Sequence, residues 1–242
     1  MMAYKFLHTG GVGLFSGFSW PLPDGGEPGA WVASEGEPVR CSNGIHACDA
    51  STLVEWIDDE LWMIELSGAI STFEGVLVAP QGRLLRRISE WNPSTARELG
   101  EACIWRLRDL VVDALRTNRL EAEADRLVRT TDLDELQGDA ASERSDGDDA
   151  VNSGLAYLRD TVELSRGGRP DACRGETADA GHGAIAANVT YVSAVAAGAF
   201  AAKRTDDPTA FAAAFDRERD WQRQWIRDRL ALTEPAMAPG SA

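Results

Sequence analysis

The chain has three histidines and four cysteines, the residue types that most readily support catalysis or bind metals. His8 follows an apolar segment, and His46 lies between Cys41 and Cys48. An imidazole near neutral pH can act as an acid, a base or a hydrogen-bond donor, so both histidines are candidate catalytic residues. Zinc also prefers thiol and imidazole ligands, but the spacing from Cys41 to Cys48 is not that of a CxxC knuckle. We therefore assign no metal ligands and interpret the two cysteines as small buried apolar residues, with a metal-stabilised module as the alternative.

Two acids complete the candidate catalytic set. Glu65 lies inside the apolar segment 61–66, and Glu90 lies at the end of a later predicted strand. Either carboxylate could pair with a histidine in a pocket and take part in acid–base chemistry. A solvent-facing strand position is the alternative for both.

Candidate ligand-binding residues lie beside these groups. Thr9 and Gly10 follow His8 directly, and Arg83 and Arg86 belong to the only basic cluster of the N-terminal half. Guanidinium groups hold anionic ligands through paired hydrogen bonds, although a solvated strand edge explains the arginines equally well. No Walker A, dinucleotide-binding, HExxH or GxSxG motif is present, so the cofactor stays unknown.

Composition limits the partners. The 242 residues carry a formal charge of −15, whereas a nucleic-acid-binding face needs clustered Lys and Arg, so no nucleic-acid partner is expected. No run of about 18 apolar residues predicts a membrane span, and the N-terminus lacks the apolar region of a secretory signal. Four scattered cysteines do not predict a disulfide framework. A cytoplasmic protein with a small-molecule ligand is expected, and a homo-oligomer is left open.

These residues must be positioned by an α+β fold. The pattern predicts a small antiparallel β-rich module over 1–92 with one short helix, packed against a helical C-terminal half. Segment 14–20 alternates as a strand does, and segments 76–78 and 83–88 are predicted to form a hairpin.

From residue 93 the apolar residues recur with a helical period. We predict a long helix over 93–131, an acidic loop or linker over 132–150, a helical region over 151–234 and a frayed tail over 235–242. Asp207 followed by Pro208 is a strong helix start. The last helix places Trp221 and Trp225 near one stripe, where they could anchor a partner.

The sequence resembles an uncharacterised domain family of phage and actinobacterial proteins. The likeness rests on a C-x-x-G-[FILV]-H-A-C pattern, a short helix and a strand ending V-E-x-x-G, and it covers most of the chain. The residues that carry it are Cys41–Cys48, Trp56, Leu61–Gly68, Ser16–Pro21, Glu101–Cys103 and Phe211–Trp225. This resemblance implies no established activity.

A second resemblance is to ADP-ribosyltransferases of the diphtheria-toxin and poly-ADP-ribose-polymerase type. His8-Thr9-Gly10 and Gly44–Ala47 would occupy the first two motifs of that fold. Glu90 would be the candidate for its catalytic acid, although its placement does not match the motif convincingly. His46 departs from the tyrosine usual in the second motif. The resemblance implies an enzyme that uses NAD. The alternative is a non-enzymatic binding or regulatory protein that acts through its helical half.

Overall fold

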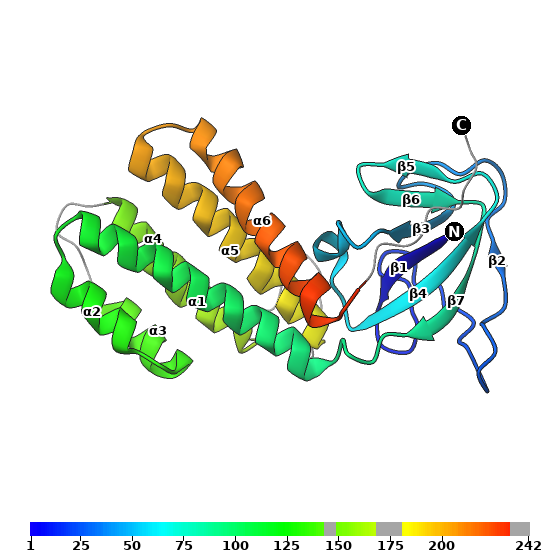
Figure 1. Cartoon of the computed structure of the whole chain (residues 1–242), viewed down its shortest axis with the longest axis horizontal. Helices are drawn as coiled ribbons and strands as arrows, with labels where there is room; N and C mark the ends of the chain where they lie inside the picture. The colour runs from blue at the N-terminus through cyan, green and yellow to red at the C-terminus, as the bar shows by residue number, and fades with distance from the viewer. Residues whose placement is uncertain (143–148, 168–180, 233–242) are drawn as a thin grey trace. The chain divides into compact units, whose positions relative to one another are not determined.

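The computed structural model describes residues 1–142, 149–167 and 181–232. The predicted α+β fold class is confirmed: the N-terminal half forms one antiparallel sheet, and the described C-terminal half is helical (Figure 1). In chain order the elements are β1 (Met2–Leu7), β2 (Val32–Ala33), β3 (Ile45–Cys48), the 3₁₀ helix η1 (Leu53–Trp56), β4 (Glu60–Ser67), β5 (Ser71–Phe73), β6 (Val76–Ala79), β7 (Gln81–Arg87), α1 (Pro93–Thr117), α2 (Glu121–Arg129), α3 (Leu133–Ser142), α4 (Asp149–Ser165), α5 (His182–Thr205) and α6 (Thr209–Arg229).

The described residues divide into two compact units. The first contains residues 1–96 together with 181–187 and 223–232, so it adds the start of α5 and the end of α6 to the sheet. The second contains the remaining described helical residues. The N-terminal module predicted over 1–92 is therefore only part of the unit that carries the sheet.

The strands follow the order β2-β7-β4-β1-β3-β6-β5, and each neighbouring pair is antiparallel (Figure 1). β5 and β6 form a hairpin whose turn residues, Glu74 and Gly75, both have positive φ, as a type I′ turn requires. The predicted hairpin of segments 76–78 and 83–88 is wrong, because β6 pairs with β3 and β7 pairs with β4. Only Pro80 separates β6 from β7, which is too short a connection for a two-residue turn.

Alternation along β4 explains why this segment is a central strand. Trp62, Ile64 and Leu66 enter one buried cluster, while Leu61 lies on the opposite face. Leu61 is paired with Phe6 of β1, whose ring packs edge-on against the buried Trp91 at 5.3 Å. The sheet is thus covered by apolar side chains on both faces, and β1 and β4 lie at its centre.

The predicted strand over 14–20 is wrong. Residues 9–20 form a loop with isolated bridges between His8 and Val12 and between Val12 and Ser19. Gly17 has a φ of 64°, which turns the chain back before a strand can form. Among the described residues, Ser19 is the one member of this segment that makes a bridge, so its alternation does not extend into a ladder.

The long helix predicted over 93–131 starts as expected but is divided. Asn92 caps α1, since its side-chain oxygen accepts the N–H groups of Ser94 and Thr95 at 3.0 and 3.2 Å. The helix ends at Thr117, and α2 begins at Glu121 after Arg119 adopts a φ of 62°. A residue in this left-handed conformation ends a helix, which explains the division.

The first part of the acidic segment 132–150 is helical instead of a loop or linker. Asp132 accepts the N–H of Glu135 at 2.8 Å and so caps α3. Leu136 and Ala140 are 0% and 4% exposed, so the helix has an apolar face despite its acids. Residues 143–148 and the predicted frayed tail 235–242 lie outside the described residues.

The start of the last helix matches its prediction. The Asp207 carboxylate accepts the N–H of Thr209 at 2.8 Å, which confirms the predicted start of α6.

α5 is long and apolar enough to span a membrane by length and composition, and half of its most apolar window is buried within the protein. A core helix passes the same test, so the helix gives only weak support for a membrane span.

A half-buried lysine in β1 gives the fold a pH dependence. The Lys5 ammonium donates to the His46 carbonyl at 2.6 Å and lies 5.2 Å from the centre of the Trp20 ring. Burial lowers the pKa of Lys5 to about 8. Between that value and the ordinary value of 10.5, the unfolded chain binds more protons than the folded one.

We therefore expect the free energy of unfolding to rise, relative to a Lys5→Met variant, as the pH increases from 8 to 10.5. The side chain keeps some exposure, so the expected gain is about 2 kcal/mol and not the full value of the pKa shift. Urea denaturation of both proteins at pH 7.5 and 10 measures it. Because other titrating groups cancel in the difference, an equal change in both proteins would show that Lys5 titrates normally.

Candidate functional site

Three consecutive acids are buried where β4 begins. Asp58, Asp59 and Glu60 are 3%, 8% and 5% exposed. The antiparallel register of β1 and β4 pairs Leu7 with Glu60, so the residues after Leu7 lie beside Asp58 and Asp59. Buried carboxylates are tolerated only with partners, and the loop that starts at His8 supplies them.

Glu60 binds the backbone of this loop. Its two carboxylate oxygens accept the N–H groups of Gly10 and Gly11 at 3.2 and 3.1 Å, where both glycines have positive φ. Successive N–H groups in this conformation form a concave anion-binding nest. The Trp62 indole also donates to Glu60 at 3.1 Å, and the Arg87 guanidinium lies 3.2 Å away. Glu60 therefore fixes the loop to the sheet.

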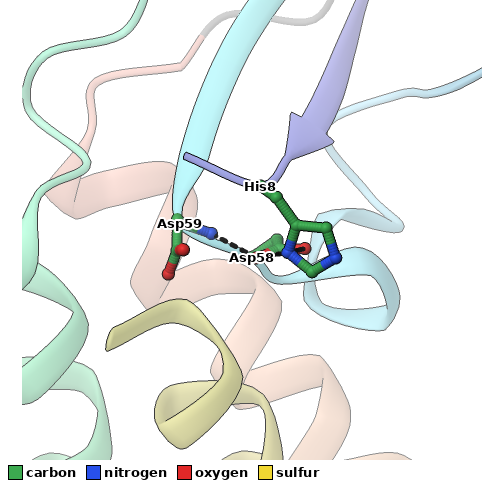
Figure 2. A group of neighbouring side chains, drawn as sticks. All are labelled: His8, Asp58 and Asp59. Atoms are coloured by element: carbon green, nitrogen blue, oxygen red, sulfur yellow. Dashed lines mark hydrogen bonds and ion pairs between the residues drawn. The ribbon is translucent and has the colours of Figure 1, made fainter. Parts of the chain in front are cut away.

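His8 and Asp58 form a hydrogen-bonded dyad. The His8 Nδ1 lies 3.0 Å from Asp58 Oδ1 and 2.9 Å from Oδ2, and the side chains are 40% and 4% exposed. A carboxylate only accepts hydrogen bonds, so Nδ1 carries the proton of the neutral ring and Nε2 carries the lone pair. Figure 2 shows the second ring nitrogen directed away from both aspartates.

The surroundings of Asp58 hold its carboxylate in place. Oδ1 also accepts the N–H of Asp59 at 2.7 Å, and the Asp58 carbonyl accepts the indole N–H of Trp91 at 2.7 Å. Burial raises the pKa of Asp58, while the Asp59 N–H and His8 oppose this shift. Among the described residues, Oδ2 has no hydrogen bond despite its approach to the imidazole. The dyad is therefore rigid on the Asp58 side and open on the His8 side.

Asp59 serves a different purpose. Its carboxylate accepts the Thr9 hydroxyl at 3.0 Å and the N–H of Gly183 at 3.0 Å. Figure 2 shows this carboxylate turned away from His8, toward the first turn of α5. The ring of His182 also lies 2.9 Å from the Asp59 carbonyl. A carboxylate at a helix N-terminus is favourable, so Asp59 holds the start of α5 within the first unit.

The three histidines, all in described parts of the chain, differ in their free ring atoms. His46 has both nitrogens engaged, since Nδ1 lies 3.1 Å from the Gly44 carbonyl and Nε2 accepts the N–H of Cys41 at 3.0 Å. Burial lowers the pKa of His46, which favours the neutral ring that these two bonds require. His182 is bonded to Asp59 through Nε2. Only Nε2 of His8 combines exposure with the absence of a partner in the described structure.

The contacts of the other predicted site residues are with groups other than His8 and Asp58. Glu65 is paired across the sheet with Arg83 at 2.7 Å, and the Arg83 guanidinium lies over the Trp31 ring. Arg86 and Glu90 are exposed. Glu65 and Arg83 thus form a structural ion pair with each other.

Of the predicted set, the structure brings together His8, Thr9 and Gly10. It places them against three acids that sequence reasoning missed. These acids form a run directly before the apolar segment 61–66, and this position at the start of a buried strand is the sequence feature that could have indicated them.

His8, Asp58 and Asp59 also form a group that could hold a metal, with ligand atoms within 4.8 Å of one another. Asp59 faces away from the other two and has hydrogen bonds to both carboxylate oxygens, which favours a dyad over a metal centre (Figure 2). In the described structure, Cys41, His46 and Cys48 do not form such a group. Cys48 is buried as expected, and burial raises the pKa of its thiol. Cys41 is exposed, so the prediction that both cysteines are buried is wrong for this residue.

No protein-family model, curated protein or solved structure matches the chain. The resemblances to phage and actinobacterial proteins and to ADP-ribosyltransferases therefore stay predictions. The fold and the site define an α+β protein with a His–Asp dyad at the edge of a loop that is held by buried acids. A fold does not determine an activity, so function must be inferred from the chemistry of this site.

Proposed function

We propose that the sheet-bearing unit is an enzyme that acts on a small molecule, with His8 as its acid–base residue. The observation that carries this proposal is the bond from His8 Nδ1 to the buried Asp58, which leaves Nε2 exposed. The carboxylate selects one tautomer, orients the ring and stabilises the imidazolium that forms when Nε2 takes a proton. Hydrolysis or group transfer, in which a hydroxyl or water loses its proton to Nε2, is the reaction class that suits this geometry.

Exposed aromatic surface on the same unit supports a ligand beside the dyad. Phe15, in the loop that follows His8, is 79% exposed. Its ring packs edge-on at 6.4 Å against Trp56, two residues before Asp58. Large exposed apolar side chains often belong to binding sites, because their burial by a ligand is favourable.

Transfer of ADP-ribose from NAD is the narrower form of the proposal. It would use His8 with Thr9 and Gly10, as the resemblance implies. The Thr9 hydroxyl and the Gly10 N–H are already bonded to Asp59 and Glu60, so NAD would have to displace these bonds or use other groups. The broader assignment does not require this rearrangement, and NAD is one substrate to be tested within it.

Chemical modification tests the exposed nitrogen without a known substrate. Diethyl pyrocarbonate acylates accessible, unprotonated imidazole nitrogens, so mass spectrometry should find His8 modified before His46 and His182. An Asp58→Asn variant should change the tautomer of His8, which is visible in nitrogen NMR shifts. Equal modification of all three histidines would contradict an open Nε2.

Turnover tests the role of the dyad. Panels of esters, phosphate esters, glycosides and NAD should reveal a substrate whose turnover falls by roughly 10²–10⁴-fold in His8→Gln and Asp58→Asn. His46→Gln serves as the matched control and should keep the turnover of the correctly folded fraction. Full turnover by a folded His8→Gln protein would exclude His8 as the acid–base residue.

A partner-docking function of the last helix has less support. Trp221 and Trp225 are half-buried, and Trp221 lies under the Arg106 guanidinium at 4.3 Å. Because these rings are only partly exposed, they give less support to the aromatic anchor surface that the sequence suggests.

A further inference from the structure

The helical unit contains a cavity that the His8 site does not use. Its volume is about 340 Å³, and its walls come from α1, α5 and α6. This volume lies at the lower end of the range of small-molecule sites. All its lining residues belong to the second unit.

The walls of the cavity are mainly apolar and small. Leu110 and Phe200 line it together with five alanines, namely Ala197, Ala201, Ala210, Ala213 and Ala214. Alanine side chains on facing helices do not fill the space between them, which explains the hollow. Such a surface favours a short aliphatic group, because burial of apolar area is the main driving force for binding it.

The charged lining residues are unequally neutralised. Arg106 is held by the buried Glu218 in a two-pronged pair, with N···O distances of 3.0 and 2.9 Å. Arg204 and Arg217 line the same cavity and have no ion pair with any described residue. Both side chains are exposed, so their guanidinium groups are accessible to a ligand that enters the cavity.

We infer that this cavity binds a small amphipathic anion. Its carboxylate or phosphate head would pair with Arg204 and Arg217, and its apolar tail would lie against the alanines. Guanidinium groups match both kinds of head through paired, charge-assisted hydrogen bonds. The inference is independent of the enzymatic role of His8.

Calorimetric titration of the full chain tests the site with four eight-carbon probes. Octanoate and octyl phosphate should each bind at one site, whereas octanol and octylammonium should not. The tighter of the two anions identifies the head group. Arg204→Gln and Arg217→Gln should each weaken binding roughly tenfold, the loss expected for one charge-assisted contact.

Two further variants test the tail and control for the loss of a positive charge. Ala213→Leu places a larger side chain at the exposed edge of the cavity and should reduce binding of the tail. Arg97→Gln removes an exposed arginine of α1 outside the cavity and should leave the affinity unchanged. Undiminished binding by the folded Arg204→Gln/Arg217→Gln double variant, equal binding of octanol, or no saturable binding of either anion would overturn the inference.

Discussion

Replacing Glu60 by glutamine is expected to lower the free energy of unfolding by about 2–3 kcal/mol, because buried N–H donors lose their acceptor. The carboxylate receives hydrogen bonds from Gly10, Gly11 and Trp62 and also pairs with Arg87. A glutamine side chain keeps one accepting oxygen but turns an N–H₂ group toward these donors. Several donors would then be left buried without a partner, and the loop that carries His8 would detach from the sheet.

Urea denaturation of the two proteins at neutral pH measures this loss. Glu65→Gln is the matched control, because it makes the same chemical change on the same strand. Glu65 and its partner Arg83 are 34% and 30% exposed, so this pair should contribute less than about 1 kcal/mol. Equal effects of the two substitutions would contradict the role assigned to Glu60.

Substitution of Gly183 by alanine is expected to cost about 3 kcal/mol, at the upper end of overpacking effects. A Cβ atom there would lie 2.0 Å from the backbone carbon of Asp58 and 2.3 Å from the N of Asp59. Backbone atoms cannot rotate away as a flexible side chain can, so the first turn of α5 must move. This movement would break the bond from the Gly183 N–H to Asp59.

Thermal and urea unfolding measure the cost, and diethyl pyrocarbonate reports on the cause. His182 should become reactive in Gly183→Ala, because its bond to the Asp59 carbonyl depends on the same close approach. Gly138→Ala is the control: among the described residues, no atom beyond the adjoining backbone of α3 lies within 4 Å of its new Cβ, so α3 should gain about 0.5–1 kcal/mol. A Gly183→Ala protein as stable as the parent, with His182 still protected, would contradict this packing.

The site could be predicted only in part. His8, Thr9 and Gly10 stand out because a histidine next to a glycine turn is visible in the sequence alone. His46 stands out for the same reason, yet its two ring bonds to the backbone within the same short segment make it a local structural residue. The residue type alone cannot distinguish these cases, because the decisive contact of His8 is with a residue 50 positions away.

The sequence by itself determined the features that depend on neighbours along the chain. These are the alternation of β4, the start of α6 at Asp207 and the α+β division, since pleat, caps and helical period act over a few residues. Only the tertiary structure decided the separation of β6 from β7 and the burial of Asp58, Asp59 and Glu60. Both follow from the pairing of strands that are distant in sequence, whose register no local pattern specifies.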